Sequence, residues 1–217
     1  MITVVDVETS WQVTDTGGYD PSPYHPDNIL VSVGINDEYY FTNHSERIDD
    51  GCYHNIQSIL DKTTLLVGHN IKFDLMWLIE AGFKYTGKVY DTMLGEYILN
   101  RGIRKSLTLE MSCRRRRIGS KDNRIKEFTD RGIPFQNIPA NVVEEYGRMD
   151  VQITRDLFNS QMADFRMPKN KHLLMTAKMM NEFLIVLADM EANGININLE
   201  DLSKVEKEYR AEFAYLK

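Results

Sequence analysis

This sequence has few cysteines, no long apolar run and no excess of positive charge. The 217 residues contain two cysteines, Cys52 and Cys113, and no C-x-x-C pair, so we expect two reduced thiols and no disulfide framework. No run of about 18 apolar residues is present, so we expect no membrane span. The N-terminus lacks the basic and apolar regions of a secretion signal, so we expect a cytoplasmic protein.

The charge balance is acidic. The net charge is −6 at pH 7, which argues mildly against a surface devoted to nucleic acid, although positive charge can be concentrated locally. The length suits one ordinary domain, or one domain and part of another. An apolar content of 42% is sufficient for a normal core.

Strand and helix signals alternate along most of the chain. Apolar, β-branched runs predict strands at 2–7, 29–35, 38–43, 64–70 and 87–93, the first of them central. Helical spacing predicts helices at 53–62, 72–82, 94–102 and 137–165, with a loop at 14–28 and basic helical pieces at 106–131. We therefore expect an α/β fold, a mixed sheet with helices on both faces.

The C-terminal part is expected to be helical. A break near 167–171 precedes two more helical runs, which residues 194–197 join. The last run stops in mid-pattern, without a glycine or proline stop signal. This pattern predicts C-terminal helices that belong to a longer protein.

Two acids lie one residue apart in the first predicted strand. Side chains alternate along a strand, so Asp6 and Glu8 point to one face while Val5 and Val7 point to the other. Like charges on one face repel, and each raises the pKa of the other unless a cation lies between them. A divalent metal would resolve this repulsion. Taken alone, however, the motif is better explained by a strand end at which acids meet solvent.

Three further residues extend this chemistry. Asp74 lies one turn into a predicted helix, where the helix dipole alone would favour an acid. Tyr146 and Asp150 are four residues apart and share one helical face, which an amphipathic helix with a polar edge would also explain. The apolar stripe of that helix is expected at Val142, Val143, Met149 and Ile153.

Together and in this order, the motifs resemble those of the DEDD superfamily of 3′→5′ exonucleases, in its tyrosine-containing subfamily. The matching residues are Asp6, Glu8, Thr9, Asn70, Phe73, Asp74, Tyr146 and Asp150. The resemblance implies a ribonuclease-H-like fold with a mixed five-stranded sheet. It also implies hydrolysis of phosphodiester bonds at 3′ ends.

The resemblance gives each residue a role. The four acids are expected to hold two Mg²⁺ ions, for which Mn²⁺ can substitute, because all the ligands are hard oxygens. Asp6 would bridge the ions, Glu8 and Asp150 would complete one site, and Asp74 would hold the other. Tyr146 would orient the attacking water. The implied substrate contacts are Thr9, Asn70 and Phe73.

Two longer stretches of the sequence indicate a particular subgroup of these exonucleases. "VYDTMLGEYILNRG" and "MEANGI" look like segments of family A DNA polymerases of the bacterial polymerase I type. This implies a proofreading exonuclease domain at 1–166 and, at 167–217, the truncated start of the polymerase thumb. The implied substrate is single-stranded DNA or a frayed 3′ end. The implied partner is the polymerase module of the same natural chain, in a bacterial cell or a phage-infected host.

Two alternatives stay open. One is a stand-alone RNA-processing 3′→5′ exoribonuclease with the same site. The other is a non-catalytic nucleic-acid docking domain. The four acids argue against the second alternative, because a dead site has no reason to keep four like charges together.

Several residues outside the motifs have two explanations. In "SCRRRRIGSKDNRIK", helical spacing puts Arg114 and Arg117 on one face, where they would contact backbone phosphates or form a solvated surface. Trp11 would either wedge against the terminal base or pack the loop beside it. His69 is expected to be structural or to lie at the substrate edge, and not to ligate a metal.

Overall fold

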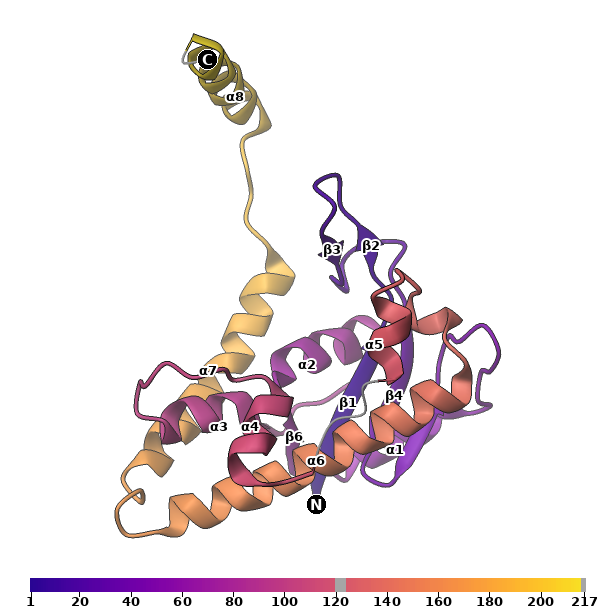
Figure 1. Ribbon diagram of the computed structural model, residues 1–217, viewed down its shortest axis with the longest axis vertical. Helices are drawn as coiled ribbons and strands as arrows, with labels where there is room; N and C mark the ends of the chain where they lie inside the picture. Colours follow the sequence, from indigo (N-terminus) through magenta and orange to yellow (C-terminus); the bar gives the residue numbers. More distant parts are fainter. Residues whose placement is uncertain (120–123, 216–217) are drawn as a thin grey trace.

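The computed structural model describes residues 1–119 and 124–215, and its centre is a five-stranded sheet of order β5-β4-β1-β6-β7 (Figure 1). The strands are β1 (Ile2–Thr9), β4 (Leu30–Ile35), β5 (Glu38–Phe41), β6 (Leu65–Gly68) and β7 (Lys88–Asp91). β1 is the middle strand, antiparallel to β4 and parallel to β6. The predicted α/β class, its mixed ribonuclease-H-like sheet and its central first strand are confirmed.

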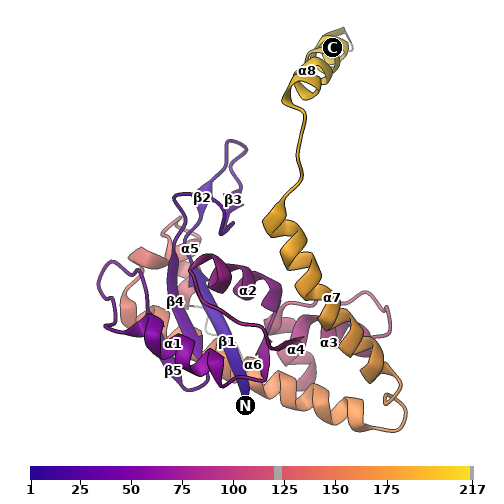
Figure 2. The same ribbon diagram turned by 180° about the vertical axis from the view of Figure 1, so that it is seen from behind.

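Helices cover both faces of this sheet (Figures 1 and 2). α1 (Cys52–Asp61) and α2 (Ile71–Glu80) lie on one face. α6 (Ala140–Arg166) crosses the other face, with α4 (Leu109–Arg116) and α5 (Arg124–Thr129) packed on it. α3 (Thr92–Leu99) and α7 (Leu173–Asn193) lie beside β7, and the short η1 (Phe135–Asn137) precedes α6.

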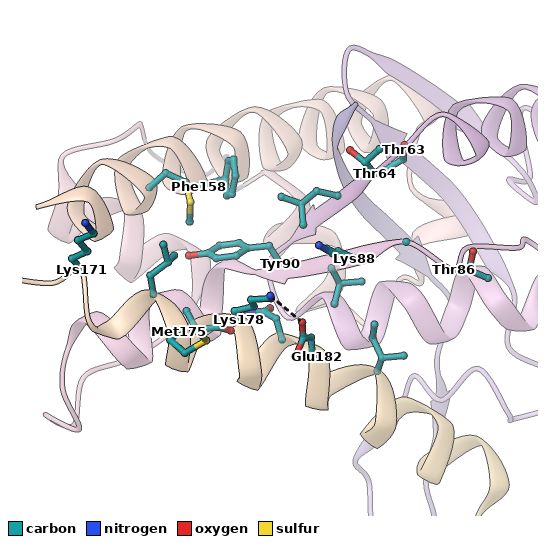
Figure 3. Close-up of a pocket in the computed structure, with 18 residues that line it drawn as sticks. Thr63, Thr64, Thr86, Lys88, Tyr90, Phe158, Lys171, Met175, Lys178 and Glu182 are labelled. Atoms are coloured by element: carbon teal, nitrogen blue, oxygen red, sulfur yellow. Dashed lines mark hydrogen bonds and ion pairs between the residues drawn. The ribbon is translucent and has the colours of Figure 1, made fainter.

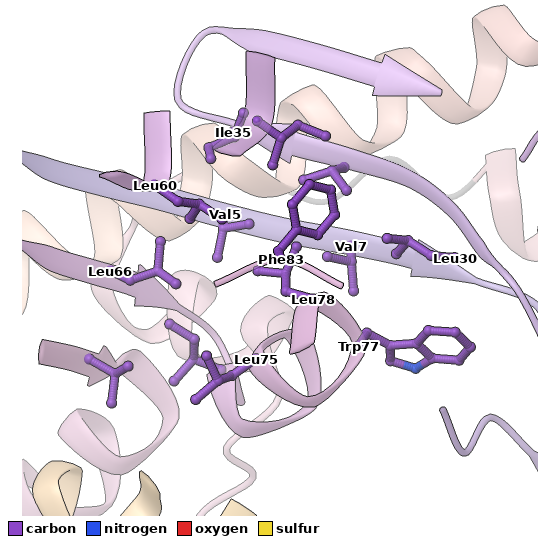
Figure 4. Close-up of a cluster of buried hydrophobic side chains, with 14 of the residues drawn as sticks. Val5, Val7, Leu30, Ile35, Leu60, Leu66, Leu75, Trp77, Leu78 and Phe83 are labelled. Atoms are coloured by element: carbon purple, nitrogen blue, oxygen red, sulfur yellow. The ribbon is translucent and has the colours of Figure 1, made fainter. Parts of the chain in front are cut away.

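Alternation along β1 divides its side chains between two cores. Val5 and Val7 pack with leucines of α1 and α2 (Figure 4). Val4 packs on the opposite side, in the cluster that contains the apolar side chains of α6. Each fully buried valine or leucine contributes roughly 1.5–3 kcal/mol. The same alternation turns Asp6 and Glu8 toward α6, because residues 4, 6 and 8 of the strand lie on one face.

The ring of Tyr39 sets how closely α6 approaches the sheet. Its hydroxyl lies 2.8 Å from Ser32 Oγ and donates to Val143 O at 3.3 Å. A Cβ atom on Gly147 would lie 2.4 Å from the ring, and one on Gly34 would lie 2.8 Å from Val151 Cγ2 of α6 and 3.3 Å from the ring. Gly147 therefore makes room for the ring, and Gly34 lets Val151 of α6 approach β4.

The predicted apolar stripe of α6 is wrong at one position. Val143 and Ile153 are buried, and Val142 is half-buried. Met149 is 37% exposed. It lies two turns after Val142, at the border of the buried face, where helical spacing alone does not decide burial.

The predicted loop at 14–28 is wrong in one respect, because its first part belongs to a small hairpin. β2 (Gln12–Val13) and β3 (Tyr19–Asp20) pair antiparallel. The Thr14 amide donates to Gly18 O at 2.9 Å, and Gly17 has a φ of 78°, a conformation that favours glycine. Strands of two residues have no periodicity that a sequence pattern can reveal.

The two C-terminal helices differ in how they are attached. α7 packs on α2, α3 and β7. α8 (Leu199–Tyr215) has no buried residue among those described and stands away from the sheet (Figures 1 and 2). The division between 166 and 167 stays a prediction, although packing favours a boundary after α7. Within the described residues, no helix combines the length and apolar character that a membrane crossing requires.

We predict that Gly147→Ala lowers the free energy of unfolding by ~1–3 kcal/mol, because the added Cβ overlaps the ring of Tyr39. In a Tyr39→Leu background the same substitution should be neutral or stabilising, since alanine is the better helix former. Urea unfolding of both single variants, the double variant and the wild type checks this. An equal effect of Gly147→Ala in both backgrounds would contradict the packing argument.

Candidate active site

The structure brings the predicted catalytic residues to one end of β1. Asp6 and Glu8 extend from the middle strand, Tyr146 and Asp150 from α6, and Asp74 from the start of α2. Asp6 and Asp150 line one cavity of about 470 Å³. The rest of its lining is His69, Met93, Leu107, Thr108 and Leu109. Three elements that are far apart in the sequence thus contribute acids to one region.

Asp74 is held against the backbone of β1. The parallel pairing of β1 with β6 ends at Val4 and Val67, and beyond it the Val7 amide donates to Asp74 Oδ1 at 3.0 Å. Burial raises the pKa of Asp74 well above its usual value, and the charge of Asp6 raises it further. The two carboxylates are therefore close enough to repel each other.

The phenol of Tyr146 keeps its proton. Burial raises its pKa far above the usual value, and the charges of Glu8, Asp150 and Asp6 act in the same direction. A hydrogen bond to the carboxylate of Asp150, one helical turn later, also holds the proton on the phenol. At neutral pH, Tyr146 therefore keeps its proton and donates a hydrogen bond to Asp150.

The donor chemistry of the acids fits a hard divalent cation. Glu8, Asp74 and Asp150 are 8%, 4% and 3% exposed. Carboxylate oxygens are the ligands that Mg²⁺ prefers, and a cation between buried acids removes their repulsion. Across residues 1–119 and 124–215, no three His, Cys, Asp or Glu side chains already surround an ion position. The predicted ligand set stays a prediction.

The predicted substrate contacts lie in three different settings. Asn70 lies just before α2. Its side chain is exposed, and its backbone has the left-handed conformation, with a φ of 62°. Phe73 packs on the α1–α2 core. Thr9 is buried at the end of β1, where the register with β4 shifts. Asn70 is thus the most accessible to a ligand of the three, and all three roles stay predictions.

The two aromatic side chains with open roles are both packed by protein groups. His69 Nδ1 lies 2.8 Å from Thr92 Oγ1, and its Nε2 lies 2.8 Å from Leu107 O. With both ring nitrogens engaged, His69 is a structural residue in the wall of the acid cavity. Trp11 meets Phe135 edge-on at 5.8 Å between ring centroids, which supports its packing role.

The predicted shared face of Arg114 and Arg117 is wrong, because α4 ends at Arg116. Arg117 follows the helix with a φ of 58°, which breaks the helical spacing. Both Arg114 and Arg117 are exposed. Residues 120–123 of the basic stretch lie outside the described part of the chain.

The two central arginines of the basic run are structural. Arg115 Nη2 lies 3.2 Å from Glu96 Oε2, and Arg116 pairs with Glu96 as well as with Asp164. Glu96 is 3% exposed, and a buried acid is tolerated where arginines pair with it. These ion pairs fix α4, whose first turn lines the acid cavity. No sequence signal marks Glu96, which lies inside a helix of ordinary composition.

A larger cavity than the acid cavity lies elsewhere. It measures about 890 Å³ and lies between β7, α6 and α7, among Tyr90, Phe158 and Met175, as Figure 3 shows. None of the predicted catalytic residues, all of which are described, lines it. Most of its lining surface is apolar, although Lys88, Lys178 and Glu182 also contribute to it.

The chain matches one protein-family model, described as a 3′–5′ exonuclease of the type found in family A DNA polymerases, over residues 14–163. The match contains Asp74, Tyr146 and Asp150, while Asp6 and Glu8 precede it. DNA polymerase I of Borreliella burgdorferi is 26% identical over 145 residues, which is 67% of this chain. The chain spans about 15% of the length of that polymerase.

Solved structures with lower identity share the fold. The POL domain of Pol1 from M. smegmatis, in complex with DNA primer-template and dNTP, has a TM-score of 0.66 at 16% identity, covering 96% of this chain and 31% of that one. NrnC of Brucella melitensis bound to pGG has a TM-score of 0.64 at 17% identity, covering 89% and 85%. NrnC with bound Mg²⁺ has a TM-score of 0.61 at 16% identity, covering 89% and 86%.

We predict that Asp74→Asn stabilises the metal-free protein at neutral pH. The folded-state pKa of Asp74 is raised by burial and by Asp6, so the folded state binds the proton more tightly than the unfolded chain does. Its contribution to stability is therefore greatest at low pH and is lost as the pH rises through the folded-state pKa. The asparagine variant carries no charge and keeps an acceptor for the Val7 amide.

Thermal unfolding in EDTA between roughly pH 5 and pH 8 measures this difference. The Tm of the wild type should fall relative to that of Asp74→Asn as the pH rises. Asp130→Asn, at an exposed position, is the matched control and should follow the wild type. Parallel curves for the wild type and Asp74→Asn would contradict the assignment of a charge-repelled Asp74.

Proposed function

This chain belongs to the 3′–5′ exonuclease family of the type found in family A DNA polymerases, and we propose that it proofreads during replication by hydrolysing phosphodiester bonds at DNA 3′ ends. The observation that carries the proposal is the convergence of the acids at one end of β1. They come from the middle strand, from α2 and from α6. Their order along the chain is that of the tyrosine-containing DEDD exonucleases, which the sequence resembles.

The four acids would hold two Mg²⁺ ions, with Mn²⁺ able to substitute. When bound, the ions would lower the pKa of a water molecule and neutralise charge on the leaving oxygen. Asp6 is the candidate shared ligand for three reasons. It lies on the middle strand, it lines the cavity with Asp150, and its charge raises the pKa of Asp74. Glu8 and Asp150 would complete one ion site, and Asp74 would complete the other.

Tyr146 orients the attacking water in this proposal. Its proton is directed to Asp150, so its oxygen is able to accept a hydrogen bond from water. A phenol with so strongly raised a pKa does not act as a base at neutral pH. The role of Tyr146 is therefore to hold the water in line and not to remove its proton.

The acid cavity has room for one terminal nucleotide. Its volume of about 470 Å³ falls within the usual range for small-ligand sites, about 300–1,000 Å³. The proposed contacts to the nucleotide beside this cavity are Asn70, Phe73 and Thr9, of which Asn70 directly follows the cavity residue His69. The exposed Arg114 and Arg117 are the proposed contacts to phosphates farther along the strand.

A stand-alone exonuclease that acts on RNA is the second candidate function. It is supported by the fold that this chain shares with B. melitensis NrnC bound to pGG. DNA is favoured by the polymerase-type family model and by the B. burgdorferi polymerase. The two functions differ in one measurable property, the sugar of the strand that is degraded.

A polymerase module of the same natural chain is the proposed partner. α7 buries one face against β7 and exposes an apolar stripe on the other, where Met175, Met179 and Phe183 are 72%, 62% and 56% exposed. α8 exposes a second stripe, which includes Leu202 and Phe213. Exposed apolar stripes on consecutive helices are typical of surfaces that another protein body covers.

The direct experiment is digestion of 3′-labelled single-stranded DNA. We expect release of the labelled nucleotide with Mg²⁺ and none with EDTA, and a 5′-labelled strand should give a ladder that shortens from its 3′ end. Single-stranded and mismatched ends should be degraded faster than matched duplex ends, because fraying a duplex costs base stacking and pairing. An RNA strand of the same sequence tests the second candidate.

Asp6→Ala is the control for this experiment. Removing a ligand from a two-ion site should lower the rate by roughly 10³-fold or more, with the fold retained. Near wild-type turnover of Asp6→Ala would contradict the site. Degradation that starts from 5′ ends would contradict the proposed function.

Tyr146→Phe separates orientation of water from ligation of metal. The ring still packs and one hydrogen bond is lost, so we expect a rate roughly 10–1000-fold lower with unchanged Mn²⁺ affinity. Asp150→Asn should weaken Mn²⁺ binding itself, because a neutral amide replaces a charged ligand. Mn²⁺ titration and single-turnover rates measure both. If Tyr146→Phe loses metal as Asp150→Asn does, the phenol is a ligand and its proposed role is wrong.

A further inference from the structure

The starts of two helices converge on one buried carboxylate beside the acid cluster. α2 follows β6 and α3 follows β7, and these strands are parallel neighbours. Asp91, the last residue of β7, is 1% exposed. Its Oδ1 accepts from the Asn70 amide at 2.9 Å and from the Met93 amide at 2.8 Å. Burial raises the pKa of Asp91, and the amides of Asn70, Met93, Leu94 and Ile71 act to lower it.

The capping of α2 by Asp91 is unusual. Asp91 is the N-cap of its own helix α3, which is a common role for aspartate. Asn70 is the N-cap of α2, and an asparagine there normally turns its side chain back onto the first turn. Within α2, all of whose residues are described, Asn70 makes no such bond. Its side chain is exposed while Asp91 binds its backbone amide.

We propose that Asp91 is a positioning residue that caps α2 from the neighbouring strand and so frees the Asn70 side chain for the terminal nucleotide. The same contact fixes where α2 begins, and Asp74 lies one turn farther along that helix. The inference rests on the proposed function, because it assigns Asn70 a substrate to bind. Asp91 itself is buried and acts only through the residues that it holds.

The backbone around Asp91 is anchored on both sides, which makes its carboxylate a fixed reference point. The Asp91 amide donates to Asn181 Oδ1 of α7 at 2.6 Å. Thr92 Oγ1 donates to Gly68 O at 3.1 Å and lies 2.8 Å from His69 Nδ1. The carboxylate is therefore placed by β6 and α7 as well as by its own strand.

Asp91→Ser is the sharpest test of this role. A serine hydroxyl still caps α3, but it is one bond shorter than the carboxylate and does not reach the Asn70 amide. Asp91→Ala removes both caps and is the harsher variant. On single-stranded DNA, kcat/KM should fall about 10–100-fold for Asp91→Ser, since misplacement of a binding group by about 1 Å has effects of this size. Asp91→Asn keeps a carbonyl acceptor and should stay within about threefold of the wild type.

A double-mutant cycle tests whether Asp91 acts through Asn70. Asn70→Ala should cause a loss similar to that of Asp91→Ser. The double variant should lose no more than about threefold beyond the worse single variant, because both changes remove the same interaction with substrate. Wild-type kcat/KM for Asp91→Ser, or losses that multiply in the double variant, would overturn the inference.

Asp49→Ala is the matched control for loss of a backbone-capping carboxylate. Asp49 Oδ2 accepts from the Phe41 amide at 2.9 Å in β5, at the opposite edge of the sheet from β7. Its kcat/KM should stay within about threefold of the wild type when measured well below the Tm. A loss equal to that of Asp91→Ser would mean that any capping carboxylate has this effect, and would overturn a specific role for Asp91.

Amide hydrogen exchange separates this inference from the proposed function. In Asp91→Ser, the amides of Asn70 and Ile71 should exchange at least about tenfold faster than in the wild type, with Met93 unchanged. Unchanged exchange at Asn70 and Ile71 would overturn the capping role whatever the activity is. If exchange changes as expected but the wild type releases nothing from any 3′ end, the proposed function fails while the capping of α2 by Asp91 holds.

Discussion

Repulsion among buried carboxylates at the end of β1 is the constraint on which the rest of this structure depends. Taking several acids out of water next to one another opposes folding, so other interactions must hold their elements in place. The two apolar clusters on either side of β1 do this, since Val5 and Val7 bind it to α1 and α2 while Val4 binds it to the α6 face. The acids are therefore placed by packing that does not include them.

Small residues and backbone hydrogen bonds set the finer distances. Tyr39 between Gly34 and Gly147 sets the approach of α6 to β4. The Val7 amide binds Asp74 where the pairing of β1 with β6 has ended. These contacts act at fixed backbone positions, so they place side chains within the narrow tolerance that catalysis requires.

α7 connects two surfaces of different character. One face carries Asn181, which binds the backbone of β7 beside the acid cluster. The opposite face exposes methionines and Phe183. The helix therefore packs on the exonuclease fold with one face and exposes an apolar surface on the other.

Local periodicity in the sequence determined the five strands of the main sheet, the long α6 and the orientation of the motif residues. Alternation put Asp6 and Glu8 on one face, and helical spacing put Tyr146 and Asp150 together, because both relations involve neighbours along the chain. Tertiary structure decided the contacts that no local pattern encodes. Arg115 and Arg116 pair with a buried acid of α3, and Asp91 caps α2 as well as its own helix. Such contacts depend on which strands are neighbours, and the order of strands follows from the packing of the whole chain.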